Sequence, residues 1–175
     1  SLIFMSLPSN RSVLIVEDNR YYASMIENHL KQYPGFTVTA FDNGDAAMEA
    51  YDRVRPDIVL LDYHLNVEDD TAPTGYDYLQ QIKDRNAEQA VVMLSSNDNV
   101  KQVVELLKTG AYDYVLKDES AFEQLDKVLI NLEEVLRIRN EVKSLKTILR
   151  RQNRRFAWTL AAVAVIVTAC FEWLA

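Results

Sequence analysis

Four apolar runs of the sequence each end in polar side chains that could act together as a reactive site. Runs of this length and composition are typical of buried parallel strands, and the carboxyl ends of such strands meet at one edge of a sheet. Three carboxylates, a hydroxyl and an ammonium would converge there, and the carboxylates would need a divalent cation to offset their repulsion. The runs are 13–16 followed by Glu17 and Asp18, 57–61 followed by Asp62, 91–94 followed by Ser95, and 112–116 followed by Lys117.

The segments between these runs have the spacing of helices, so the chain alternates strand and helix. Such alternation predicts an α/β fold in which a parallel sheet is covered by helices on both faces. His29, in the middle of the first helix, is expected on the surface. A fifth strand is expected at 36–41, and the four short helices at 19–30, 44–54, 75–85 and 98–109.

Each of these polar groups has an ordinary explanation when it is taken alone. A single Asp after a strand is usually a turn or helix-cap residue, and a single Lys at the end of a strand usually faces solvent. Their joint occurrence, in order, at the ends of strands one, three, four and five is what indicates a shared site.

As a set, these motifs resemble the receiver domain of bacterial two-component response regulators. The resemblance implies a flavodoxin-like, doubly wound, five-stranded parallel sheet with strand order 2-1-3-4-5, followed here by a long C-terminal α-helix. It covers about residues 11–130 and leaves 1–10 as an N-terminal arm or a cloning remnant. The motifs are VLIVEDN at 13–19, IVLLDYHL at 58–65, VMLSS at 92–96 and GAYDYVLK at 110–117.

The same resemblance implies a role for each residue of the site. Asp62 would accept a phosphoryl group from a histidine kinase or a phosphotransfer protein. The expected cofactor is Mg²⁺, which prefers one or two carboxylates together with water and phosphate oxygens. The implied metal ligands are Glu17, Asp18, Asp62 and the backbone carbonyl of His64; Ser95 and Lys117 would bind the phosphoryl oxygens; and Ser95 and Tyr114 would form the switch.

Three features depart from the family's usual pattern. Glu17 stands where Asp is more common. Asp118 follows Lys117 where the family often has a cis proline, and because a cis bond before other residues costs about 3–4 kcal/mol, a trans peptide is expected. The loop at 63–74 is longer than usual and acidic.

The charge of the chain is distributed unevenly. Residues 1–120 hold 20 acidic and 10 basic side chains, whereas residues 121–175 hold 6 and 9. An acidic body argues against nucleic-acid binding, which needs a basic face. The single Cys170 excludes an internal disulfide framework and a cysteine zinc site, and it agrees with a cytoplasmic location.

The last helix is much longer than one domain needs. Its apolar positions Val135, Ile138, Val142, Leu145 and Leu149 are spaced 3, 4, 3, 4, which is the heptad spacing of a coiled coil. This predicts a helical extension at 131–155 that forms a homodimer. The competing interpretation is one amphipathic helix that lies on its own domain.

Residues 156–175 are largely apolar and follow a cluster of arginines. Trp158 and Trp173 lie near the two ends, as interfacial anchors would. The segment therefore predicts a membrane anchor that leaves the acidic domain at the inner face of the cytoplasmic membrane. The competing interpretations are an apolar dimerisation helix and the first part of a longer region.

The function expected from all of these features is a signalling switch, with no enzyme activity beyond the domain's own phosphorylation and slow dephosphorylation. Two alternatives stay open at this stage. One is a phosphate sink or phosphorelay intermediate without an output of its own. The other is a membrane-tethered scaffold whose receiver is not phosphorylated.

Overall fold

The computed structural model describes residues 10–65, 71–97 and 99–174, and at 155, 157 and 159–174 it describes the backbone alone. The predicted arm at 1–10 lies almost wholly outside the described residues. The same holds for Asn66 to Asp70 of the predicted acidic loop and for Asp98.

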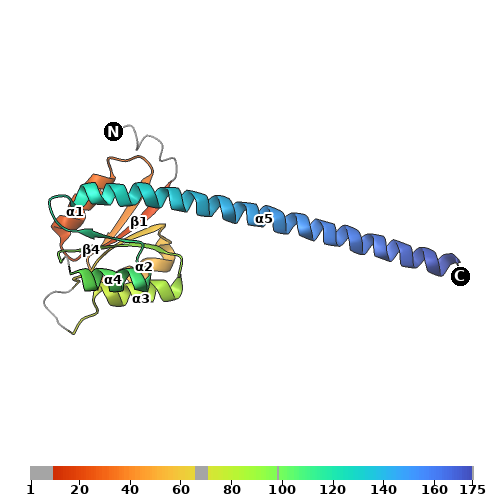
Figure 1. Ribbon diagram of the computed structural model, residues 1–175, viewed down its shortest axis with the longest axis horizontal. Helices are drawn as coiled ribbons and strands as arrows, with labels where there is room; N and C mark the ends of the chain where they lie inside the picture. The colour runs from red at the N-terminus through yellow and green to blue at the C-terminus, as the bar shows by residue number, and fades with distance from the viewer. Residues whose placement is uncertain (1–9, 66–70, 98, 175) are drawn as a thin grey trace. The chain divides into compact units, whose positions relative to one another are not determined.

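Five strands form one parallel sheet, and its order confirms the predicted doubly wound topology (Figure 1). The order is β2-β1-β3-β4-β5. In register, Val16 lies beside Leu61, and Asp62 beside Leu94, so β1, β3 and β4 end at the same edge. The strands are β1 (Arg11–Val16), β2 (Phe36–Phe41), β3 (Ile58–Asp62), β4 (Ala90–Ser95) and β5 (Asp113–Leu116).

Five helices follow the strands. The helix α4 begins at Val100 rather than at the predicted Asp98, because the side chain of Asn99 accepts a hydrogen bond from the backbone N–H of Lys101 and caps the helix there. The helices are α1 (Arg20–Leu30), α2 (Gly44–Val54), α3 (Gly75–Arg85), α4 (Val100–Thr109) and α5 (Ala121–Leu174).

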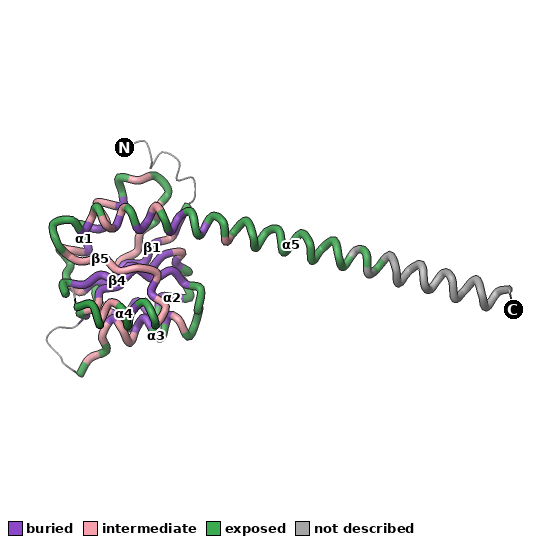
Figure 2. The backbone as a smooth tube through the Cα atoms, viewed as in Figure 1, coloured by how far each residue is buried: buried purple, intermediate pink, exposed green. Residues whose placement is uncertain are grey.

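Both faces of the central strands β1, β3 and β4 are buried, which explains why these strands read as continuous apolar runs (Figure 2). Alternate strand residues such as Leu14 and Leu61 pack with α2, α3 and α4 in one cluster, around the fully buried Tyr78. The intervening residues, such as Ile15 and Leu60, point to the opposite face. That face is covered by α1 and the first turns of α5 (Figure 1).

The chain divides into two compact units, Ser1–Leu132 and Glu133–Ala175, and α5 contributes to both. Each unit has its own stripe of apolar residues along this helix. The stripe in the first unit is buried and consists of Ala121, Leu125, Val128, Leu129 and Leu132. The stripe in the second unit is exposed and consists of Val135, Ile138, Val142, Leu145 and Leu149.

The predicted membrane-spanning helix at 156–175 is not supported. Within the described part of the chain, no helix combines the length and the apolar character that a bilayer crossing requires. The side chains from residue 159 onward lie outside those that the structure describes.

A close backbone approach joins α3 to the end of β3. The first residue of α3, Gly75, donates its N–H to the carbonyl of Tyr63 at 2.9 Å. A Cβ atom at this position would lie 2.1 Å from the backbone oxygen of Asp62 and 2.7 Å from the Cα of Tyr63. Because both obstacles are backbone atoms, no side-chain rotation can relieve the clash.

We therefore expect Gly75→Ala to lower the free energy of unfolding by about 1–3 kcal/mol, the usual cost of overpacking a rigid site. Urea unfolding followed by circular dichroism measures this loss. The matched control is Gln81→Ala, which changes an exposed position of the same helix and should leave the midpoint nearly unchanged. Equal midpoints for the two variants would contradict the close approach.

Candidate functional site

Three carboxylates meet at the carboxyl edge of the sheet. Glu17 and Asp18 follow β1, and Asp62 is the last residue of β3. One ligand atom from each lies within 4.8 Å of the others. Glu17 is 1% exposed and Asp62 is 3% exposed, so two of the three charges are almost completely removed from water.

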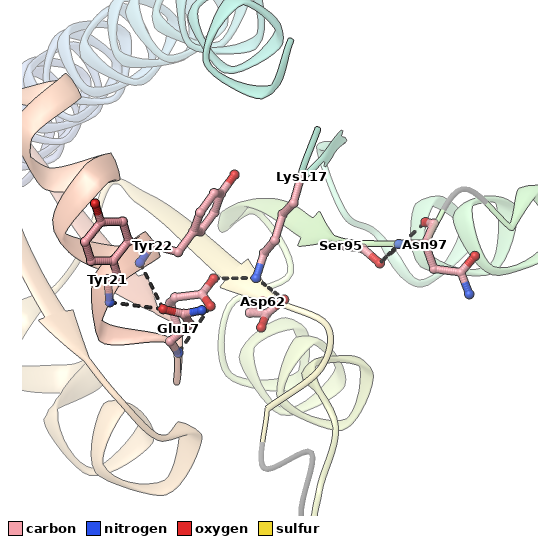
Figure 3. Close-up of polar contacts among 8 residues, drawn as sticks. Glu17, Tyr21, Tyr22, Asp62, Ser95, Asn97 and Lys117 are labelled. Atoms are coloured by element: carbon pink, nitrogen blue, oxygen red, sulfur yellow. Dashed lines mark hydrogen bonds and ion pairs between the residues drawn. The ribbon is translucent and has the colours of Figure 1, made fainter. Parts of the chain in front are cut away.

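The ammonium of Lys117 lies between the two buried carboxylates (Figure 3). Its Nζ is 2.6 Å from Glu17 Oε2 and 2.8 Å from Asp62 Oδ1. The backbone of β5 positions this lysine, because the Lys117 N–H donates to the carbonyl of Ser95 at the end of β4 at 2.8 Å. The lysine is only 12% exposed, so this ion pairing is poorly screened by solvent.

The pocket fits a divalent cation. The Oδ1 of Asp62 is buried and, among the described residues, accepts no hydrogen bond of acceptable geometry, although the ammonium lies close to it. One ammonium also cannot neutralise three carboxylates. A buried oxygen without a hydrogen bond and an excess of negative charge are what a hard cation with oxygen ligands would satisfy.

The burial of Glu17 beside another carboxylate raises its pKa from 4.5 to about 7. Burial is the main cause, the nearby Asp62 carboxylate adds to it, and the hydrogen bond and charge of Lys117 oppose it. Without a cation, Glu17 is therefore partly protonated near neutral pH.

The hydroxyl of Ser95 does not face Asp62 (Figure 3). It accepts a hydrogen bond from the backbone N–H of Asn97 at 3.1 Å. The hydroxyl of Tyr114 donates to the backbone carbonyl of the same Asn97. The two predicted switch residues are thus joined through one loop residue, and Ser95 is placed beside the carboxylate cluster rather than in it.

An aromatic path that the sequence did not reveal leads from the site to α5. The ammonium of Lys117 lies 4.9 Å from the ring centre of Tyr22 on α1, and that ring stacks on Phe122 of α5 at 6.2 Å. Phe122 packs on His29 at 4.8 Å, and His29 Nε2 lies 2.6 Å from an oxygen of Asp126. No local pattern of the sequence pointed to this path.

Two expectations near the site have clear outcomes. His29 was expected on the surface, yet its side chain is only 17% exposed because α5 covers it. The peptide between Lys117 and Asp118 is trans, since no described peptide bond is cis. The side chain of His64 is exposed, and its ring packs edge-on against Tyr63.

The comparisons with known proteins agree with this geometry. A family model described as the response regulator receiver domain matches residues 13–129. The chemotaxis protein CheY of Listeria monocytogenes is 35% identical over 121 residues, which cover 69% of this chain and 94% of that protein. The probable transcriptional regulatory protein TcrX of Mycobacterium tuberculosis is 32% identical over 126 residues, 72% of this chain and 50% of TcrX.

A solved structure gives the same result. NtrX from Brucella abortus superposes with a TM-score of 0.68 at 26% identity, over 77% of this chain and 29% of that one. The fold, the pocket at the carboxyl edge of the sheet and a family model that spans more than half of the sequence therefore agree. The chain belongs to the response regulator receiver domains, which accept a phosphoryl group on an aspartate and switch state in signal transduction.

Proposed function

We propose that Asp62 is the phosphoacceptor of this receiver domain and that Lys117 is the cation that accompanies the transfer. The observation that carries this proposal is the position of the Lys117 ammonium, 2.8 Å from Asp62 Oδ1 and 2.6 Å from Glu17 Oε2, two members of a cluster of three carboxylates. Among the described residues, no other cluster of three or more carboxylates, histidines or cysteines has ligand atoms close enough to share one cation.

Glu17, Asp18 and Asp62 would hold Mg²⁺, with the backbone carbonyl of His64 as a further ligand. Bound there, Mg²⁺ would offset the negative charge that develops on the transferring phosphoryl group. The raised pKa of Glu17 is consistent with this assignment, because burial and, second to it, the charge of Asp62 both disfavour an ionised Glu17, and a bound cation would offset both.

The transfer itself is a displacement at phosphorus. A carboxylate oxygen of Asp62 forms a bond to phosphorus, the bond from phosphorus to the imidazole nitrogen of the donor histidine breaks, and the imidazole leaves with that electron pair. Lys117 then pairs with a phosphoryl oxygen instead of with Asp62. The same pocket would later admit water for slow dephosphorylation, so the domain itself supplies the catalytic groups for both steps.

The switch would follow from the hydrogen bonds of Asn97. To reach a phosphoryl oxygen, the Ser95 hydroxyl must leave the N–H of Asn97. The backbone of Asn97 would then rearrange, and the Tyr114 hydroxyl would lose the carbonyl to which it donates. The added charge on Asp62 would in this way change the surface formed by the β4–α4 loop and β5.

The output would pass through α5. The first unit already contains the beginning of this helix, and the second unit carries an exposed heptad stripe at Val135–Leu149. Apolar side chains at this spacing are buried when two helices pair, so we infer that the extension forms a homodimer. The histidine kinase or phosphotransfer protein that serves the pocket is a separate partner.

The direct test treats the purified protein with acetyl phosphate and Mg²⁺ and follows intact mass. We expect the gain of one phosphoryl group by the unchanged protein and no gain by Asp62→Asn, because an amide is a very poor nucleophile toward phosphorus. Asp84→Asn is the matched control, since Asp84 is an exposed carboxylate on α3. Labelling of Asp62→Asn at the normal level would show that another residue is the acceptor.

The pH dependence of stability tests the electrostatics of the pocket. Between about pH 4.5 and 7 the folded protein keeps a proton on Glu17 that the unfolded chain has lost, because burial raises the pKa from 4.5 to about 7. The unfolded state therefore binds fewer protons, and the contribution of Glu17 to the free energy of unfolding falls as the pH rises through this window.

We expect this fall in the metal-free protein and a smaller fall in Glu17→Gln, which cannot ionise at this position. Millimolar Mg²⁺ should restore stability at pH 8 in the unchanged protein. Thermal unfolding at several pH values, with EDTA or with Mg²⁺, measures both effects. Parallel pH profiles for the two proteins without metal would refute the burial argument.

A further inference from the structure

The exposed stripe of α5 has charged flanks that specify how two copies of the chain would pair. Written as heptads, the stripe has Val135, Val142 and Leu149 at position a, and Ile138 and Leu145 at position d. These five side chains are 39–58% exposed in the single chain. They lie on the second compact unit, so they do not belong to the core of the receiver.

The flanking positions carry opposite charges on the two sides of the stripe. The g positions directly before the first and the second heptad are acidic, Glu134 and Glu141, and the e positions within these two heptads are basic, Arg139 and Lys146. Glu134 and Glu141 already contact Arg137 of their own helix, at 2.7 and 3.0 Å. Arg137 is at position c, next to g on the helix surface. These contacts within one helix therefore leave the g side of the stripe acidic and the e side basic.

Helix orientation decides which of these charges meet. In a parallel pair, each g residue faces the e residue of the following heptad in the other helix. Glu134 would then meet Arg139, and Glu141 would meet Lys146, in both directions across the pair. In an antiparallel pair, g faces g and e faces e, so carboxylates would meet carboxylates and cations would meet cations.

We propose that the occupant of the exposed stripe is the same stripe of a second copy, in a parallel, in-register, two-stranded coiled coil. This deepens the proposed output and rests on the proposed function. Position a holds Val135 and Val142, and position d holds Leu145. A β-branched residue at a with Leu at d favours a coiled coil of two strands over one of three. Parallel pairing brings the two receivers to the same end of the coiled coil.

The interface is short. The stripe from Val135 to Leu149 spans about 21 Å of helix at a rise of about 1.5 Å per residue. Isolated helices of this length are marginal in water. The association is therefore weak enough for a change in the attached receivers to shift it, which suits an output that has to respond to phosphorylation.

Charge reversal in the full-length protein tests the pairing. Glu141→Lys places a cation opposite Lys146, and Lys146→Glu places a carboxylate opposite Glu141. Each single variant should raise the dimer dissociation constant roughly tenfold, the effect of two exposed ion pairs turned into repulsions. The double variant Glu141→Lys, Lys146→Glu should return the constant to near its original value.

Sedimentation equilibrium in low salt measures both the constant and the mass of the complex. Lys143→Glu is the matched control, because it makes the same change as Lys146→Glu at the outward position b and should leave the constant unchanged. A monomer at every concentration, a trimer, or single reversals that have no effect would each overturn the proposal.

Cross-linking decides orientation independently. In a Cys170→Ala background, a cysteine introduced by Val142→Cys meets its own copy across a parallel seam and should be oxidised to a disulfide-linked dimer in high yield. In an antiparallel pair an a position faces a d position instead, so a low yield would overturn the parallel assignment.

Labelling of the unchanged protein by acetyl phosphate and Mg²⁺ separates the two proposals. If the unchanged protein is phosphorylated on Asp62 but does not associate, the coiled coil alone is overturned. If the unchanged protein associates but is not labelled, the proposed phosphoacceptor alone is overturned.

Discussion

The contact of one ammonium with two buried carboxylates is the constraint on which this domain depends. Lys117 lies 2.6 Å from Glu17 and 2.8 Å from Asp62, where water is nearly excluded. Charges buried in this way are costly unless they are paired, and the third carboxylate, Asp18, leaves the pocket with excess negative charge. This excess negative charge is the kind that a hard divalent cation with oxygen ligands would offset.

The same lysine links the pocket to the rest of the molecule in two directions. In one direction, the backbone N–H of Lys117 donates to the carbonyl of Ser95, the last residue of β4. The hydroxyls of Ser95 and Tyr114 both bond to the backbone of Asn97 in the loop that follows. In the other direction, the lysine contacts α1 through the ring of Tyr22 and reaches the start of α5 through Phe122. A shift of Lys117 toward a phosphoryl oxygen would disturb both sets of contacts.

The long helix α5 combines two tasks because it carries two apolar stripes. The stripe that ends at Leu132 is buried and completes the core of the receiver. The stripe that begins at Val135 is exposed and has the spacing and the charged flanks of a pairing surface. One helix thus carries both a surface that completes the receiver core and an exposed stripe outside that core.

The local pattern of the sequence determined much of this protein. Continuous apolar runs identified strands buried on both faces, and the polar residues that end them included the three carboxylates and the lysine of the pocket, because parallel strands bring their carboxyl ends to one edge. Heptad spacing likewise identified the exposed stripe of α5. These features depend on residues that are neighbours in the chain, so periodicity and residue type were enough to find them.

Only the tertiary structure decided which side chains are partners. Glu17 and Lys117 are 100 residues apart in the sequence, and His29 and Asp126 are 97 apart, so no local pattern relates them. His29 became a packed residue because α5 covers it, and the Ser95 hydroxyl turned toward Asn97 because that backbone N–H lies within hydrogen-bonding reach. A sequence shows which faces of its elements are apolar and which groups can react, whereas pairing between distant groups depends on distances that exist only after the elements have packed.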